Sequence, residues 1–516
     1  MEPLTDSLRK IARGTGVALA GTVLALLLGF FARIIIARYG SAADYGIYSL
    51  SLVIVVFLVT LVSLGLPDGA ARYVAYFRAR GETDKVRGVT SVSIQLSAVA
   101  GVIVGMALFF SADYLATAIF HTPELAGALK IVAAGIPFSA LINIMVSVFR
   151  GFDRMEPQAY FQYGVFNGLF LLLIGALVIL RLPFVDVFYV YVAALIMTFV
   201  ALLIYTSKKV PQPISVTGWR SNAVVRKELL VFSLPLLATG VLAALTLSAD
   251  TFLLGYFKTP DVVGLYNAAR PVAQFISDPL ALMMLIYAPV ATGLYARNSM
   301  GELRRSYIIS TKWIVSLTLP FFLVLLLFPE AVLNLLFGPS YVVAAPALRI
   351  LAIGFIVGNL LGPRNATLIA FGQIRFIFWV SLALTAAYVI LNMVLIPPLG
   401  ITGAAIALAS SLTLGGIITA VKVYTLCRTQ PLSLNLIKPI AVSVVLALVF
   451  KFATHGLITV TWWMLILFFV LYYAIYGIAV VLTRSFDRED IALLLEIEKM
   501  SGVNAAAVKK VLKKFV

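Results

Sequence analysis

Two arginines lie inside the first long apolar segment, in the run LGFFARIIIARYG at residues 28–40. A charged side chain near the centre of a membrane-spanning helix costs roughly 2.5–3.5 kcal/mol on insertion scales. A guanidinium held in such a place can bind a phosphate group through two hydrogen bonds. Arg38 lies about 140° around a helix from Arg33, so they do not easily share a face. We expect Arg38 to reach the membrane interface, and Arg33 either to face a cavity or to reach the interface too.

Asp250 and Arg270 are ionisable residues of later apolar segments. They flank a predicted turn at 258–261, eight residues before it and nine after it. Each therefore lies roughly 12 Å from the turn at 1.5 Å per helical residue. The internal repeat described below places Arg33 at a similar depth. We predict a cavity in which Arg33 and Arg270 bind a ligand that carries phosphate, with Asp250 as the partner of Arg270 or as a coupling group.

Three further residues are candidates for the same cavity. Asp278 precedes Pro279, where a broken helix could expose carbonyls beside a carboxylate and so form a cation or proton site. The alternative is a kink capped by the aspartate. Asn359 and Arg364 share one apolar segment with Pro363 and could line the inner half of the cavity.

The composition determines the class of protein. Of 516 residues, 62% are hydrophobic and 12% are charged, whereas soluble domains are about half apolar and a quarter charged. We predict an all-α integral membrane protein. The net charge of +17 is concentrated in loops, which favours membrane topology over nucleic-acid binding. A single cysteine and two histidines indicate no disulfide and no metal site.

Apolar runs of spanning length occur about fourteen times, the last two at 438–456 and 462–483. Lysine and arginine gather in alternate loops, so we expect both termini in the cytoplasm. The basic tail at 484–516 should rest on anionic inner-leaflet headgroups. Asp68 and Arg72, four residues apart, are predicted to form a surface ion pair.

Two pairs of short segments suggest an internal duplication. YGIYSLS at residues 45–51 matches VGLYNAA at 263–269 with an offset of 218, and IVAAG at 131–135 matches ILAIG at 350–354 with an offset of 219. Six helices per repeat give two parallel copies. The predicted organisation is an N-lobe at 1–206, a cytoplasmic linker at 207–228, a C-lobe at 229–425, two added helices at 426–483, and the tail.

A set of motifs in this order resembles one transporter family. They are the arginine-bearing first segment, YGIYSLS, LGLPDGAARYVA, FRGFDRMEPQAY, GLYNAARPVAQF and IPPLGITGAAIA. Together they resemble the polysaccharide transporter, or Wzx-type, branch of the multidrug/oligosaccharidyl-lipid/polysaccharide superfamily. The resemblance implies a two-lobed flippase of the cell membrane. Its cargo would be a polyprenyl-linked oligosaccharide for surface polysaccharide or glycoprotein glycan assembly, and it would act as a monomer beside glycan-assembly enzymes.

The first segment is also similar to that of the lipid II flippases. Arg33 falls within one position of the arginine with which those proteins bind the lipid diphosphate, and Arg270 lies on the helix that supplies another. The second segment carries no mid-membrane arginine. This departure from the pattern implies a cargo other than lipid II.

Energy coupling and the alternative functions follow from what the sequence contains. No G-x-x-x-x-G-K-[ST] run occurs, so we expect no nucleotide and no other cofactor. The driving force would be an ion gradient, with H⁺ or Na⁺ as the candidate coupling ion, the membrane potential, or removal of the product outside. An ion-coupled multidrug or small-solute exporter would share the fold but would place a carboxylate in the first lobe. A membrane glycosyltransferase would need a sizeable outer loop with catalytic acidic residues. We therefore expect no enzymatic activity and no catalytic residues.

Overall fold

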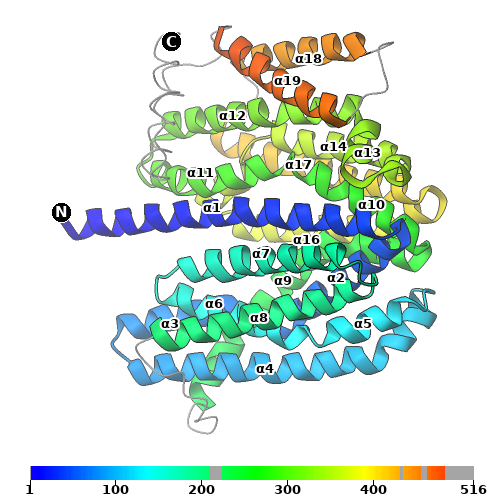
Figure 1. Ribbon diagram of the computed structural model, residues 1–516. Coiled ribbons are helices and arrows are strands. Elements are labelled where there is room, and N and C mark those ends of the chain that lie inside the picture. Colours follow the sequence, from blue (N-terminus) through cyan, green and yellow to red (C-terminus); the bar gives the residue numbers. More distant parts are fainter. Residues whose placement is uncertain (1, 210–222, 431–433, 455–461, 483–516) are drawn as a thin grey trace. The chain divides into compact units, whose positions relative to one another are not determined.

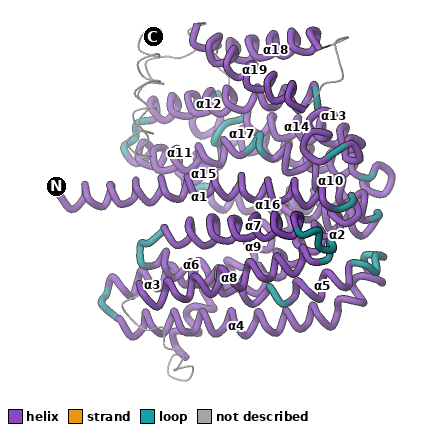
Figure 2. The backbone as a smooth tube through the Cα atoms, in the orientation of Figure 1, coloured by secondary structure: helices purple, strands orange, loops and turns teal. Residues whose placement is uncertain are grey.

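The computed structural model describes residues 2–209, 223–430, 434–454 and 462–482, and every regular element within these ranges is a helix (Figures 1 and 2). Hydrocarbon offers no partner to backbone N–H and C=O groups, so a spanning segment must satisfy them internally. The predicted all-α class is confirmed for the described part of the chain.

The chain forms two compact units, residues 1–264 and 265–516. The first unit contains ten α-helices or parts of them and two π-helical segments, with α10 beginning in it and continuing into the second. In order these are α1 (Glu2–Tyr39), α2 (Ala42–Val62), α3 (Leu66–Ala79), α4 (Thr83–Tyr114), η1 (Leu115–Ile119), α5 (Leu125–Ala133), α6 (Ile136–Gly151), η2 (Gln158–Val165), α7 (Phe166–Ile179), α8 (Asp186–Lys209), α9 (Ala223–Phe257) and α10 (Pro260–Gln274).

The second unit continues from α10 with the remaining described helices. They are α11 (Asp278–Ala296), α12 (Met300–Leu327), α13 (Pro329–Phe337), the 3-10 helix η3 (Pro339–Ala344), α14 (Ala345–Leu360), α15 (Arg364–Ala370), α16 (Ile374–Leu399), α17 (Ile401–Cys427), α18 (Leu434–Thr454) and α19 (Trp462–Leu482). Its core includes the packing of α17 against both α14 and α16.

Ten helices among the described residues are long and apolar enough to span a membrane, and twelve if each of two bent helix pairs counts as one span. Helices α18 and α19 occupy the positions predicted for the last two spans. The count of fourteen and the cytoplasmic placement of the termini stay predictions. The basic tail lies outside the described residues, as does most of the predicted linker.

Helix α9 packs with the first unit, although the repeat pattern assigned residues 229–256 to the second lobe. It packs on α2 and α3, and one close approach is to the start of α3. Gly65, whose φ is +68°, and Gly69 have no side chains, and a Cβ at either position would overlap the backbone carbonyl or the hydroxyl of Ser233 in α9. The lobe boundaries inferred from the repeat therefore stay a prediction. The contacts within the structure instead group α9 with the first unit.

Within the first unit, two repeat-related glycines pack backbone to backbone. A Cβ on Gly46 of α2 would overlap the carbonyl of Pro260 and lie 3.0 Å from the Gly264 nitrogen, and a Cβ on Gly264 would overlap the carbonyl of Ala42 and lie 3.0 Å from the Gly46 nitrogen. Both pairs, 42 with 260 and 46 with 264, are separated by the repeat offset. This reciprocal contact supports the internal duplication, and it explains why both copies need glycine there.

The second unit contains two breaks in which backbone groups leave the helical ladder. One lies at residues 275–277 between α10 and α11, and the other at 361–363 between α14 and α15. The fully buried Asn359 links them, because its Nδ2 donates to the carbonyl of Ile276 at 2.5 Å. A polar backbone group freed inside a membrane protein must find such a partner.

Arg364 and Tyr307 satisfy the second break. Arg364 Nη1 donates to the carbonyl of Gly358 at 2.7 Å, and the Tyr307 hydroxyl donates to the carbonyl of Leu361 at 2.5 Å. Gly362 has a φ of +70°, and a Cβ there would overlap Thr311 of α12. The break is thus held by side chains of the same unit.

The glycine crossing predicts a strong effect of one methyl group. Gly46→Ala should lower stability by at least the 1–3 kcal/mol typical of overpacking, since the backbones of two helices would have to separate. The measurement is the melting temperature of the purified protein in detergent. Gly168→Ala in α7 is the matched control, because a Cβ there meets nothing within 4 Å. Equal melting temperatures for the two variants would contradict the crossing.

The helix breaks predict a second destabilised variant. Asn359→Leu leaves the Ile276 carbonyl without its donor, and we expect a loss of about 1–3 kcal/mol. Asn334→Leu, at an exposed asparagine of α13 in the same unit, is the control and should leave the melting temperature nearly unchanged. A melting temperature for Asn359→Leu equal to that of the wild type would show that the hydrogen bond between the two breaks does not contribute to stability.

Candidate functional site

Arg33 lies in the spanning part of α1 and its side chain is exposed. In the described part of the chain it has no hydrogen-bond or ion-pair partner. Arg33 is thus a cation available to bind an anion.

Arg38 occupies the last turn of the same helix and is also exposed. A cation is favoured there by the negative end of the helix dipole. The ordinary electrostatics of a helix end account for Arg38, whereas Arg33, more than a turn inside α1, has no such stabilisation.

Asp250 is fully buried in α9, and its Oδ1 accepts a hydrogen bond from the backbone N–H of Thr251 at 2.8 Å. Arg270 is half-buried in α10 and belongs to the second unit. The common membrane layer predicted for Arg33, Asp250 and Arg270 stays a prediction.

The remaining candidates meet at the breaks of the second unit. Asp278 is the first residue of α11, where the helix dipole favours a carboxylate, and its side chain bonds that of Gln274. Asn359 binds the Ile276 carbonyl two residues before Asp278. Arg364 turns back onto the carbonyls of its own break. All three side chains therefore hold the breaks, and whether they also line a transport cavity stays a prediction.

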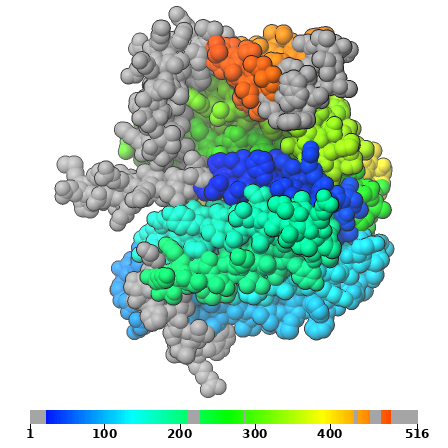
Figure 3. All heavy atoms as spheres, in the orientation of Figure 1, coloured from blue at the N-terminus to red at the C-terminus, as the bar shows by residue number. Residues whose placement is uncertain are grey.

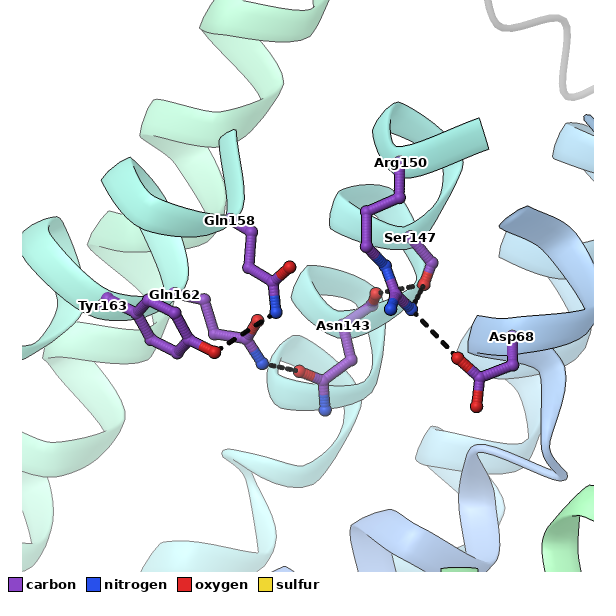
Figure 4. A network of polar contacts seen from close by, with 7 residues as sticks. All are labelled: Asp68, Asn143, Ser147, Arg150, Gln158, Gln162 and Tyr163. Carbon is purple, nitrogen blue, oxygen red and sulfur yellow. Dashed lines mark hydrogen bonds and ion pairs between the residues drawn. The ribbon is translucent and has the colours of Figure 1, made fainter. Parts of the chain in front are cut away.

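Asp68 pairs with Arg150 and not with Arg72, so that prediction was wrong. Arg150 Nη2 lies 3.3 Å from Asp68 Oδ1, joining α6 to α3 (Figure 4). The Arg72 guanidinium lies over the ring of Phe232 instead, 4.1 Å from its centroid. Helix α6 packs on α3, and this brings a partner that sequence spacing does not reveal.

A polar cavity of about 240 Å³ lies among the helices of the first unit. Its lining is contributed by α6, η2, α7 and α8, and consists of Ser139, Ile142, Asn143, Gln162, Phe166, Asn167, Tyr191 and Leu195. None of these side chains carries a charge at neutral pH. The sequence-based prediction did not include this cavity.

Hydrogen bonds hold the amides of the cavity, and Figure 4 shows the one between Gln162 and Asn143. Gln162 Nε2 donates to Asn143 Oδ1 at 3.0 Å, and Asn167 Nδ2 donates to the carbonyl of Tyr163 at 2.8 Å. Gln162 belongs to the π-helix η2, a rare geometry that often marks functional sites. Asn143, Gln162 and Asn167 are neutral polar residues within predicted spans, and a search for such residues would have found them.

Comparison with known sequences gives consistent relatives. Stage V sporulation protein B of Bacillus subtilis is 25% identical over 150 residues, and the teichuronic acid biosynthesis protein TuaB of the same organism is 26% identical over 155 residues. These matches cover 29% and 30% of this chain and 29% and 32% of the relatives. An uncharacterized membrane protein of Methanocaldococcus jannaschii is 24% identical over 428 residues, covering 77% of this chain and 80% of that protein.

Comparison with solved structures identifies the fold. The lipid II flippase MurJ in an inward closed conformation aligns with a TM-score of 0.67 at 15% identity, over 89% of this chain and 97% of MurJ. An inward-facing multidrug resistance MATE family transporter aligns with a TM-score of 0.65 at 16% identity, over 78% of this chain and 94% of the transporter. At such low identities the likeness shows the fold alone.

The family is shown by a model described as "Polysaccharide biosynthesis protein", which matches residues 11–292. The matched region contains all but the first ten residues of the first unit, with Arg33 and the polar cavity, and extends through α10 into α11. The described elements are helices, several are apolar enough to span a membrane, and the similar solved structures are a flippase and a transporter. Together with the family match, these findings confirm the resemblance inferred from the motifs. The chain belongs to the polysaccharide biosynthesis protein family, and it is a multi-pass membrane protein with the fold of the superfamily that contains MurJ and the MATE transporters.

Proposed function

We propose that this protein is a flippase that moves a polyprenyl-(di)phosphate-linked oligosaccharide from the cytoplasmic to the outer leaflet by alternating access. The observation that carries the proposal is Arg33, an exposed arginine in a membrane-spanning helix with no ion-pair partner among the described residues. Such a group is stable in this setting when it binds an anion, and a diphosphate is the anionic part of this cargo.

The size and polarity of the cargo support the proposal. A glycan diphosphate must cross roughly 30 Å of hydrocarbon, which it can do only inside a polar path, while its polyprenyl chain stays in lipid. Arg33 would bind the diphosphate, and Arg270 would be its second ligand. Asp250 and Asp278 would serve as counter-charge or as the site of a coupling ion, H⁺ or Na⁺, and Asn359 and Arg364 would line the path.

The finer features belong to the same proposal. We assign fourteen spans, cytoplasmic termini and residence in the cell membrane to the protein, with glycan-assembly enzymes as its functional partners. The protein would act as a monomer and catalyse no covalent reaction. The relatives named for sporulation and teichuronic acid biosynthesis are consistent with a role in envelope glycan assembly.

An ion-coupled drug or small-solute exporter is the alternative, favoured by the MATE-like fold. A transporter of cations would need an anionic site. The exposed charge that the spanning part of α1 carries is instead positive, from Arg33 and Arg38. This charge favours a phosphate-bearing cargo over a cationic drug.

Reconstitution tests the proposal directly. Proteoliposomes are loaded with lipid-linked oligosaccharides extracted from the cells that make the protein and labelled on the glycan with a fluorophore. A membrane-impermeant reductant bleaches the outer leaflet only, so protein-free vesicles should keep their inner-leaflet signal. We expect the protein to expose that signal to bleaching. Retained signal together with gradient-driven efflux of a cationic dye would establish the exporter instead.

The two arginines of α1 should differ in the same assay. Arg33→Ala removes a charge-assisted contact to phosphate worth about 1.5–3 kcal/mol, so we expect cargo affinity to fall between ten- and a hundredfold. Arg38→Ala is the matched control and should flip at the wild-type rate. Arg33→Lys keeps the charge but loses the bidentate geometry and should be intermediate. Equal rates for Arg33→Ala and Arg38→Ala would remove Arg33 from the site.

A further inference from the structure

The polar cavity of the first unit has the chemistry of a site for a neutral molecule. Its lining combines three amides, two hydroxyls and two aromatic rings. It contains no carboxylate, lysine or arginine side chain. A divalent cation would be held by carboxylates, and an anion by positive charge. Neither set is present in the lining, so the cavity suits a ligand that both donates and accepts hydrogen bonds.

The amide side chains of the cavity retain donor and acceptor groups that a ligand could bind. Gln162 Nε2 and Asn143 Oδ1 bind each other, and Asn167 Nδ2 binds the Tyr163 carbonyl. In the described part of the chain, no protein partner is found for Asn143 Nδ2, Gln162 Oε1 or Asn167 Oδ1. One donor group and two acceptors therefore remain, fixed in place by bonds made through the other end of each amide.

Shape and size point to one ring of a sugar. The rings of Phe166 and Tyr191 meet edge to face at 5.9 Å and form an apolar wall beside the amides. A pyranose has apolar C–H faces and a rim of hydroxyls, each of which donates and accepts. The volume of about 240 Å³ is just below the 300–1,000 Å³ of sites for drug-sized ligands, which is the right scale for a monosaccharide.

Helix α1, which carries Arg33, passes close to the cavity. A Cβ on Gly29 of α1 would lie 3.3 Å from Asn167 Oδ1, so α1 passes directly over one amide of the cavity. Arg33 lies one turn further along the same face of α1, about 6 Å away along the axis. Helix α1 packs against η2 and α7, which contain Gln162 and Asn167, and Figure 3 shows the coloured part of α1 lying along this part of the first unit.

We infer that this cavity binds the neutral sugar attached directly to the diphosphate while Arg33 binds the diphosphate itself. The inference rests on the proposed function and names the part of the cargo that the first unit recognises. In a glycosyl diphosphate the sugar ring and the phosphates are joined by a single oxygen, so one ligand can occupy both neighbouring sites. The substrate class is then a neutral hexose or N-acetylhexosamine at the reducing end of the glycan.

The test uses simple methyl glycosides, which carry neither lipid nor phosphate. The full-length protein in lipid nanodiscs is titrated with methyl glucoside, galactoside and N-acetylglucosaminide, and binding is read by saturation-transfer NMR. We expect at least one glycoside to bind in the millimolar range. Gln162→Leu, which removes the amide at similar volume, should weaken that binding tenfold or more.

Gln158→Leu is the matched control. Gln158 lies one turn before Gln162 in the same π-helix and bonds Tyr163 instead of lining the cavity, so its replacement should leave glycoside binding unchanged. Asn143→Ser is a second cavity variant in case Gln162→Leu does not fold, and melting temperatures verify folding of each. Arg33→Ala should bind the methyl glycoside as the wild type does and should bind the corresponding glycosyl phosphate more weakly.

Two outcomes would overturn the inference. Absence of glycoside binding at tens of millimolar, or equal binding by Gln162→Leu and Gln158→Leu, would leave the cavity as a water-filled packing defect. The flipping assay distinguishes failure of the sugar-site inference from failure of the proposed function. Flipping without glycoside binding would overturn the inference alone. Glycoside binding lost in Gln162→Leu, with no flipping, would support the sugar site and overturn the flippase.

Discussion

Inside hydrocarbon every backbone N–H and C=O must find its partner within the protein, and the architecture of this chain follows from that constraint. Unbroken helices satisfy it along most of the described residues. Where the second unit departs from helix, side chains replace the missing partners. Asn359 donates to the Ile276 carbonyl, and Arg364 and Tyr307 donate to the carbonyls around the second break. The polar residues of these breaks thus have a structural role whatever else they do.

Close helix crossings are the second consequence of the membrane setting. Lipid is as apolar as leucine, so helices associate through contact of small residues and not through hydrophobic exclusion. Gly46 meets Gly264 at a backbone crossing, and Gly65 and Gly69 accommodate Ser233. These glycines belong to the segments that resemble the transporter family. Such segments therefore mark where helices cross, in addition to containing Arg33 and Arg270.

Charge and neutral polarity are kept apart in the first unit. The exposed Arg33 offers a positive charge, and the cavity beyond Gly29 offers amides and aromatic rings without charge. A lipid-linked glycan has the same division, with phosphates next to a neutral sugar. Binding both parts at neighbouring sites would allow a transporter to recognise the carrier by its charge and the glycan by its hydroxyls.

The sequence by itself determined the membrane class, the helical fold, the positions of most spans and the unusual charge at Arg33. These features depend on local composition and on charge within one segment, which the order of residues contains. Only the tertiary structure decided that Asp68 pairs with Arg150, that α9 packs with the first unit, and that Asn143 and Gln162 share a cavity. Each of these depends on which helices become neighbours. Packing of whole helix surfaces sets that choice, and the periodicity of a single helix does not specify it.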